Sequence, residues 1–142
     1  AGISYKGWIA NAAAPEAFAQ NRVTVHIPRR PYVENLPGIP TIRVFEALDC
    51  GIPLVSAPWN DCEGLFRTGD DYLSVSSGDE MKEQLRTVLA DRDLANHLIQ
   101  SGLETIRSRH TCRHRVDELF EILRTCGSSR VTDALTAREA AQ

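Results

Sequence analysis

The sequence has no long apolar run, no paired cysteine motif and no strong excess of either charge. Its 142 residues carry a formal net charge of −3, so no basic field is present that would attract nucleic acid or an anionic membrane. Its apolar runs are far shorter than the roughly 20 residues of a membrane-spanning helix. Hydrophobic residues make up 42% and charged residues 25% of the chain, which is typical of one globular domain. We therefore expect neither a nucleic-acid partner nor a membrane span.

The cysteines are not arranged as metal ligands. They are Cys50, Cys62, Cys112 and Cys126, and none forms the Cys-x-x-Cys pair that is typical of structural zinc sites. A chain of this size does not need disulfides to hold its core. We therefore expect free thiols, packed as small buried hydrophobic side chains, in the reducing cytoplasm. His110 and His114 flank Cys112, but a helix capped by Thr111 explains this segment better than a metal site, so we predict no metal.

Catalytic signatures with a fixed spacing are also absent. The chain contains no Gly-x-Ser-x-Gly elbow, Walker loop, His-Glu-x-x-His helix or Gly-x-Gly-x-x-Gly turn. What it does contain is an alternation of short strand and helix patterns. Apolar and β-branched runs predict strands at residues 22–27, 52–57 and 72–76, with a strand end at 6–10. Helix patterns cover residues 15–20 and about 41–50, and three more helices follow the caps Ser77, Asp91 and Thr111.

This order predicts an α/β domain with a parallel sheet, because strands that alternate with helices pair in parallel. We place the domain at residues 1–126, and we expect the small, polar residues 127–142 to form a weak helix or to be disordered. The abrupt start suggests a part of a longer protein. Residues 28–40 contain four prolines and are predicted to form an extended loop. Residues 58–71 are predicted to be a polar loop with a helical turn near 63–66.

Ligands of such sheets bind beyond the carboxyl ends of the strands, where the two long loops begin. Arg29 and Arg30 directly follow the first strand, so they could contact a phosphate or an acidic acceptor. The alternative for both is a solvated basic turn. His26 ends the same strand and alternates with Val25 and Ile27; a histidine in such a place is more often a satisfied core or edge residue than a base.

The start of the helix at residues 41–50 is the strongest candidate for a ligand site. Free amides at a helix N-terminus attract anions with about half a positive charge. Thr41 can add a hydroxyl there, and Arg43 can add charge-assisted hydrogen bonds. Glu46 lies one turn further on and suits the two hydroxyls of a ribose. The alternative for Glu46 is an i,i+3 ion pair with Arg43.

The spacing of this helix also predicts its faces and its end. Ile42 and Phe45 are expected on the buried side, and Gly51 suits the left-handed position that ends a helix. The loop after the next strand carries Trp59, Asp61 and Glu63. Its place favours contact with a ligand, since a carboxylate could bind a sugar hydroxyl there, although ordinary loop polarity is the alternative.

The segment that joins these features resembles a known family. It runs Arg29-Arg-Pro-Tyr-Val-Glu, then Leu36-Pro-Gly-Ile-Pro-Thr-Ile-Arg-Val-Phe-Glu-Ala-Leu-Asp-Cys-Gly-Ile-Pro-Leu-Val-Ser-Ala-Pro-Trp. This run is similar to CgeB-like (spore-maturation type) glycosyltransferases, within the wider GT-B class whose motif is close to Pro-x-x-x-x-Glu-Ala-x-Ala-x-Gly-x-Pro-Val. The later segment Glu63-Gly-Leu-Phe-Arg-Thr-Gly-Asp-Asp-Tyr-Leu also fits. The resemblance covers roughly residues 16–124.

The resemblance implies a Rossmann-like, three-layer domain that is the C-terminal, donor-binding half of a GT-B enzyme. It implies a nucleotide-diphosphate sugar as donor, with Glu46 on the ribose and the turn from Pro40 to Arg43 facing the diphosphate. Helix amides and arginine could stabilise the departing diphosphate without metal, so we expect metal-independent transfer. Many retaining relatives carry a second glutamate where this chain has Gly38, so a retaining mechanism does not carry over.

Other functions share this architecture. A non-catalytic nucleotide-binding or interaction module is the main alternative to the glycosyltransferase, and a sugar-nucleotide epimerase is a weaker one. The acceptor is unknown in each case. A donor half without its first strands exposes a sheet edge, so we also expect a possible homodimer through that edge.

Overall fold

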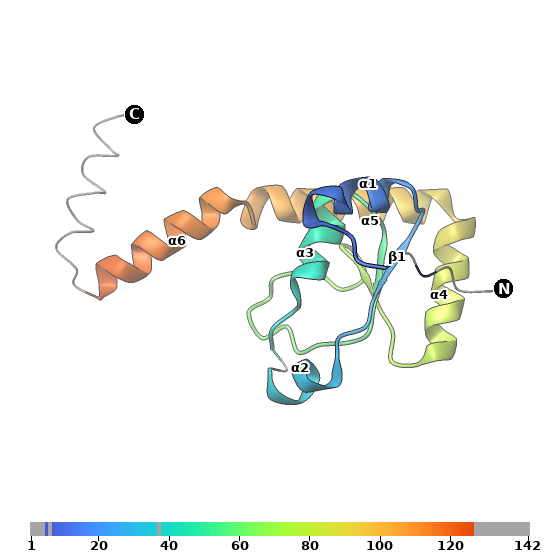
Figure 1. Ribbon diagram of the computed structural model, residues 1–142, viewed down its shortest axis with the longest axis horizontal. Helices are drawn as coiled ribbons and strands as arrows, with labels where there is room; N and C mark the ends of the chain where they lie inside the picture. The colour runs from blue at the N-terminus through green and yellow to red at the C-terminus, as the bar shows by residue number, and fades with distance from the viewer. Residues whose placement is uncertain (1–4, 6, 37, 127–142) are drawn as a thin grey trace. The chain divides into compact units, whose positions relative to one another are not determined.

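The computed structural model describes residues 5, 7–36 and 38–126, and the predicted tail at 127–142 lies outside them (Figure 1). The chain divides into two compact units at residues 106 and 107. The elements, in chain order, are η1 (Asn11–Ala13), α1 (Ala14–Ala19), β1 (Thr24–His26), α2 (Arg30–Asn35), α3 (Ile42–Asp49), β2 (Leu54–Ser56), β3 (Leu73–Ser74), α4 (Gly78–Ala90), α5 (Arg92–Arg109) and α6 (Cys112–Thr125).

The three strands form one parallel sheet in the order β1-β2-β3. Val25 of β1 is opposite Val55 of β2, and Val55 is opposite Leu73 of β3. Each predicted strand at 22–27, 52–57 and 72–76 therefore exists, in a shorter form. The strand end expected at 6–10 is wrong in its described part, because residues 7–10 form no strand.

Helices cover both faces of the sheet. Leu54 and Val55 are fully buried, and they point to opposite faces because side chains alternate along a strand. Leu54 belongs to the cluster that contains Val44 of α3, whereas Val55 packs in a second cluster with Val88 of α4. Figure 1 shows the strands running between α3 and α4. This three-layer arrangement confirms the predicted α/β class and is consistent with a Rossmann-like glycosyltransferase domain.

Helix α3 lies close to its predicted bounds, but its buried face is displaced from the one expected. Val44, Ala47 and Leu48 are buried, at the i, i+3, i+4 spacing of one helix face. Ile42 is 67% exposed, so its predicted burial is wrong. Gly51 follows with φ of 65°, as predicted for the residue that ends the helix.

Two loop predictions are corrected by the structure. Residues 30–35 form helix α2 instead of an extended loop, since Pro31 lies in the first turn, where a missing amide proton removes no helical hydrogen bond. The helical turn expected at 63–66 is absent, because residues 62–63 form a turn and Phe66 lies in a bend. Asp61 organises that segment by accepting hydrogen bonds from the amides of Leu65 and Phe66 at 2.9 and 3.0 Å.

The predicted helix caps are largely confirmed. Ser77 Oγ accepts a hydrogen bond from the amide of Glu80 at 3.2 Å, and Glu80 reaches back to the amide of Ser76 at 2.7 Å. Asp91 caps α5 through the amides of residues 93 and 94. Thr111 occupies the N-cap position of α6, but its hydroxyl lies 2.7 Å from His114 Nδ1.

The cysteines are free, as expected, but their predicted burial is wrong. Cys62, Cys112 and Cys126 are exposed and Cys50 is half-buried. Burial and the neighbouring carboxylates of Asp49 and Glu46 raise the pKa of the Cys50 thiol, which keeps that thiol protonated and weakly nucleophilic.

Candidate functional site

A groove opens where β1 ends, between α2 and the start of α3. It has a volume of about 630 Å³, and the residues that line it include His26, Arg29, Pro40, Thr41 and Arg43. Its position beyond the carboxyl end of a parallel strand is the usual place for a ligand in this type of sheet. Four residues singled out from the sequence, Arg29, Pro40, Thr41 and Arg43, thus meet on one surface.

The start of α3 forms one wall of this groove. Thr41 is extended, with φ of −75° and ψ of 159°, and among the described residues no side chain caps the helix. The first-turn amides of α3 are therefore not occupied by the side chain that most often caps them. An N-terminus in this state is suited to an anion, which the helix dipole also favours.

Arg43 and Glu46 form the ion pair that was the alternative interpretation of the sequence. Arg43 Nη1 lies 2.8 Å from Glu46 Oε2, with the Glu46 side chain 24% exposed. The same Oε2 is buried and accepts no hydrogen bond from any residue that the structure describes. The two charged groups are close enough to form an ion pair, but their relative orientation does not make a hydrogen bond. The contact is therefore Coulombic. The oxygen keeps its capacity to accept a hydrogen bond.

His26 is buried behind the groove and was not among the predicted site residues. It is 4% exposed, with Nδ1 2.9 Å from Ser56 Oγ and Nε2 2.9 Å from Thr41 Oγ1. Burial, and then the charge of Arg43, lower the pKa of His26, so the ring is neutral at pH 7. The alternation with Val25 and Ile27 indicated a satisfied histidine, but its partners come from residues 15 and 30 positions away.

A second, more apolar groove of about 330 Å³ also contacts α2. Tyr32, Leu36, Trp59 and Asn60 are among the residues that line it. The Trp59 ring stacks on Tyr72 with centroids 4.6 Å apart. Its indole Nε1 is buried and donates to none of the described residues. Trp59 is therefore placed beside the first groove rather than in it.

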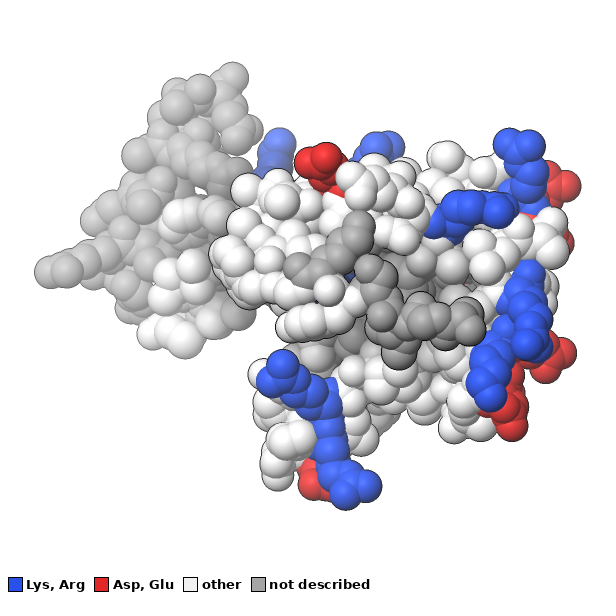
Figure 2. Space-filling view, turned by 45° about the vertical axis from the view of Figure 1, so that its right-hand side comes forward, with Lys and Arg blue, Asp and Glu red and all other residues white. Residues whose placement is uncertain are grey.

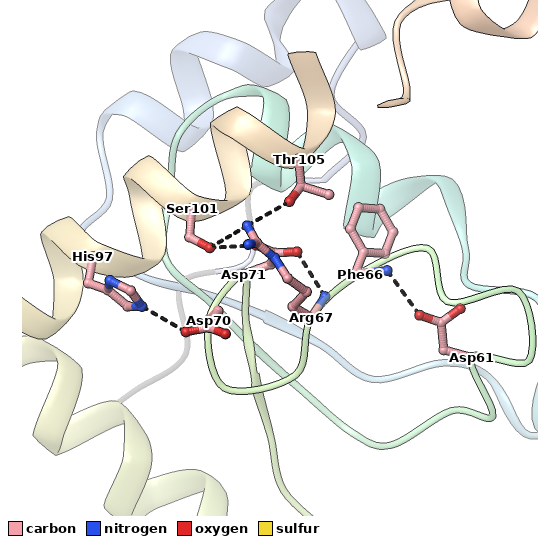
Figure 3. A network of polar contacts seen from close by, with 8 residues as sticks. All are labelled: Asp61, Phe66, Arg67, Asp70, Asp71, His97, Ser101 and Thr105. Atoms are coloured by element: carbon pink, nitrogen blue, oxygen red, sulfur yellow. Dashed lines mark hydrogen bonds and ion pairs between the residues drawn. The ribbon is translucent and has the colours of Figure 1, made fainter. Parts of the chain in front are cut away.

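The remaining predicted residues lie elsewhere. Arg30 is exposed and pairs with Glu34 at 3.7 Å. Both oxygens of Asp61 are occupied by backbone amides, as Figure 3 shows for Phe66. Glu63 is exposed and lines neither of these two grooves in the described part of the chain.

Gly38 lies in close contact with the loop that follows β2. A Cβ atom at Gly38 would lie 2.8 Å from Cys62 Sγ and 3.4 Å from the carbonyl oxygen of Asn60. A contact of 2.8 Å would force a shift of the Cys62 side chain. The position where the resemblance would place a second carboxylate is thus taken up by packing between two loops.

A buried polar network holds the loop before β3 against α5, outside the grooves (Figure 3). Asp71 is fully buried and accepts hydrogen bonds from Ser101 Oγ at 2.6 Å and Arg67 Nη2 at 3.0 Å. Arg67 Nη2 also donates to Thr105 at 3.1 Å. Burial alone would raise the pKa of Asp71, but these hydrogen bonds lower it overall. The sequence indicated only a polar loop at this position.

The surface carries no broad field of one sign on the face in Figure 2, where acidic side chains lie beside the basic ones. Among the described residues, no three His, Cys, Asp or Glu side chains gather as they would around a metal ion. No helix in this part of the chain has the length and apolar character that a bilayer span requires.

Comparison with known proteins gives one family. The family described as glycosyl transferase-like matches residues 1–121, which is most of the chain. No curated protein and no solved structure matches significantly. Because the match includes both grooves, the whole parallel sheet and the helices that cover it, the chain belongs to the glycosyl transferase-like family.

Proposed function

We propose that this chain is the donor-binding domain of a glycosyltransferase that uses a nucleotide-diphosphate sugar. The observation that carries the proposal is the groove at the end of β1, where Arg29, Thr41 and Arg43 surround the start of α3. Two guanidinium groups and a helix N-terminus match the charge of a diphosphate. The acceptor is left open.

Glu46 would hold the nucleotide ribose in this proposal. Its Oε2 is buried and accepts no hydrogen bond from the described residues, although Arg43 Nη1 lies 2.8 Å away. A ribose hydroxyl could satisfy this oxygen, while Arg43 turns from the carboxylate toward the diphosphate. Binding would thus replace a Coulombic contact with two better-matched partners.

The chemistry that this site can supply is stabilisation of the leaving group. Negative charge develops on the departing nucleotide diphosphate, and amides and arginines fixed in place lower the energy of that state without requiring a metal. We propose metal-independent transfer for this reason. We also propose that the domain is the C-terminal half of a GT-B enzyme of the CgeB-like type, as the sequence resemblance implies.

A second candidate function is a nucleotide-binding module without catalysis. The glycine at position 38 favours it, because the position where many retaining relatives carry a carboxylate has no side chain here. Such a module would bind nucleotide diphosphates in the same groove. Only an assay of sugar transfer separates the two functions, whereas binding tests the site that they share.

The site is tested by calorimetric titration of UDP, GDP, ADP and inorganic pyrophosphate into the protein, first without and then with EDTA. We expect at least one nucleotide to bind, and we expect Glu46→Ala to weaken it about tenfold or more, the usual effect of losing hydrogen bonds to a charged group. Pyrophosphate has no ribose, so its affinity should not fall.

The control is Glu83→Ala, which removes one exposed carboxylate of α4 and should leave every affinity unchanged. Absence of nucleotide binding would overturn the donor site. Equal losses for nucleotide and pyrophosphate in Glu46→Ala would overturn the ribose role of Glu46 alone. Loss of binding on addition of EDTA would contradict the metal-free part of the proposal.

A further inference from the structure

We propose that His26 is a positioning residue that couples proton uptake to anion binding, because it sets whether the Thr41 hydroxyl donates or accepts at the start of α3. This inference rests on the proposed function, since the anion is the diphosphate of the donor. Its basis is a string of buried and partly buried hydrogen bonds that joins β2, β1 and the start of α3 beside the groove.

The direction of this string follows from counting protons. Ser56 Oγ donates its single proton to the carbonyl oxygen of Ala57 at 2.7 Å, the shortest of its contacts. It must then accept from His26 Nδ1 at 2.9 Å, so Nδ1 carries the ring proton. In a neutral imidazole the other nitrogen is an acceptor. His26 Nε2 therefore accepts the hydroxyl proton of Thr41 across 2.9 Å.

The neutral state leaves Thr41 poorly suited to an anion. Its only proton points to His26, so its oxygen can offer only lone pairs to the groove that it lines. A phosphate oxygen needs donors and would find an acceptor there. Thr41 would thus oppose the attraction of Arg43 and the helix amides.

Protonation of His26 reverses the bond. Nε2–H then donates to Thr41 Oγ1, and the Thr41 proton becomes available to a phosphate oxygen, while Nδ1 still donates to Ser56. The imidazolium also adds a positive charge behind the groove. Only the protonated state of His26 lets Thr41 act as a donor to the groove, beside the helix amides and the cation Arg43.

The groups around His26 determine the direction of the effect. The charged ones in the described part are Arg43 of α3, with Glu46 paired to it, and Arg29 on the same groove. β2 contributes the neutral Ser56, and the next loop contributes Trp59, whose ring lies edge-on to His26 with centroids 6.1 Å apart. A bound diphosphate neutralises the arginines and raises the pKa of His26 above its lowered value in the free protein.

By linkage, a ligand that raises the pKa of His26 binds more tightly at lower pH. The affinity begins to rise as pH falls through the pKa of the complex, and it stops rising below the pKa of the free protein. The probes are UDP-glucose, GDP-mannose and dTDP-glucose, whose phosphates do not titrate between pH 5.5 and 7.5. We expect the affinity of a probe that binds to rise as pH falls over this range, by at most about tenfold per pH unit, which is the limit when one proton is taken up.

Matched variants separate this role from a structural one. Thr41→Ser keeps the hydroxyl and should keep the full pH dependence, whereas Thr41→Val should lose the part of it that the hydroxyl carries. His26→Gln cannot titrate and should bind with a flat pH profile. Two-bond ¹H–¹⁵N spectra of the wild type should show His26 as the neutral Nδ1–H form when free at pH 7.5, and a larger imidazolium fraction in the complex than in the free protein at lower pH.

Each outcome decides a distinct point. Binding with the same affinity at pH 5.5 and 7.5, or equal pH profiles for Thr41→Ser and Thr41→Val, overturns the role of His26 and leaves the donor site standing. A free ring protonated on Nε2 overturns it without any ligand. Failure of all three probes to bind overturns the proposed function and this inference together.

Discussion

Asp71 shows how this small domain keeps a charge in its interior. The carboxylate is fully buried, which disfavours the charged form, yet hydrogen bonds from Ser101, from the Arg67 backbone and from the Arg67 side chain lower its pKa overall. Its partners come from the preceding turn and from α5, so one side chain ties a loop to a helix about 30 positions later.

We predict that Asp71→Asn lowers the free energy of unfolding by about 2 to 3 kcal/mol at pH 7, the usual effect of losing charge-assisted hydrogen bonds inside a protein. Asp70→Asn is the control. Asp70 is exposed and pairs with the exposed His97, so its loss should change stability by less than about 0.5 kcal/mol. Urea denaturation of the two variants gives both values, and equal effects would contradict a special role of Asp71.

The pH dependence of the same carboxylate adds a second readout. Because its folded pKa lies below the ordinary value of 3.8, its contribution is complete above that value and is lost as pH falls toward the folded pKa. Asp71→Asn should therefore differ from the wild type most at neutral pH and least in acid. A constant difference down to pH 2 would show that Asp71 acts by packing rather than by charge.

Single residues also show what the sequence could predict of the site. Arg29, Thr41 and Arg43 were predictable because each follows from its place at a strand end or a helix start, which is local information. The position of Asp61 was not predictable. Its carboxylate accepts hydrogen bonds from amides of its own loop, and that loop conformation does not follow from a sequence pattern. The pairing of His26 with Thr41 depends on how α3 docks on β1, which is a tertiary contact.

At the scale of elements, the junction between α3 and β2 determines how α3 packs against the sheet. Gly51 has a φ of 65°, which returns the chain from the helix to the buried strand. A Cβ atom there would also lie 3.3 Å from Leu103 Cδ1. The backbone conformation therefore favours glycine, and a larger residue would also need a small shift of the Leu103 side chain.

We predict that Gly51→Ala destabilises the protein by about 1 to 2 kcal/mol, the cost of a left-handed residue with a side chain. Gly78→Ala is the matched control at the start of α4. No atom lies within 4 Å of its added Cβ, and an alanine there should be neutral or stabilise by up to about 1 kcal/mol. Urea unfolding midpoints should move in these directions, and a neutral Gly51→Ala would contradict the preference for glycine.

Element predictions failed where local rules competed. The four prolines of residues 28–40 favoured an extended loop, but Pro31 lies in the first turn of α2, where it supports a helix. The buried stripe of α3 was expected through Ile42, yet Ile42 borders the groove and is exposed. The buried face of α3 is formed by Val44, Ala47 and Leu48 instead.

At the scale of the whole molecule, β1 is an edge strand of the sheet that the described residues form. Thr24 and His26 bond to the segment containing β2, so Val25 directs its backbone groups toward the outer edge of the sheet. Val25 and Ile27 are 43% and 69% exposed, and Val25 and Trp8 line a groove of about 860 Å³ beside β1. An apolar edge of this kind is a surface for pairing with another strand.

We predict that the protein self-associates through β1, with sedimentation velocity over a concentration series showing a monomer–dimer equilibrium. Val25→Lys places a charge on the exposed edge, which is how natural sheets block pairing, and should leave a monomer. Leu119→Lys of α6, an equally exposed apolar position, should not change the equilibrium if β1 is the interface. A monomer in the wild type at every concentration would refute the association. A dimer that persists in Val25→Lys but is lost in Leu119→Lys would place the interface at α6, because an added charge should disrupt the dimer only where it lies in the interface.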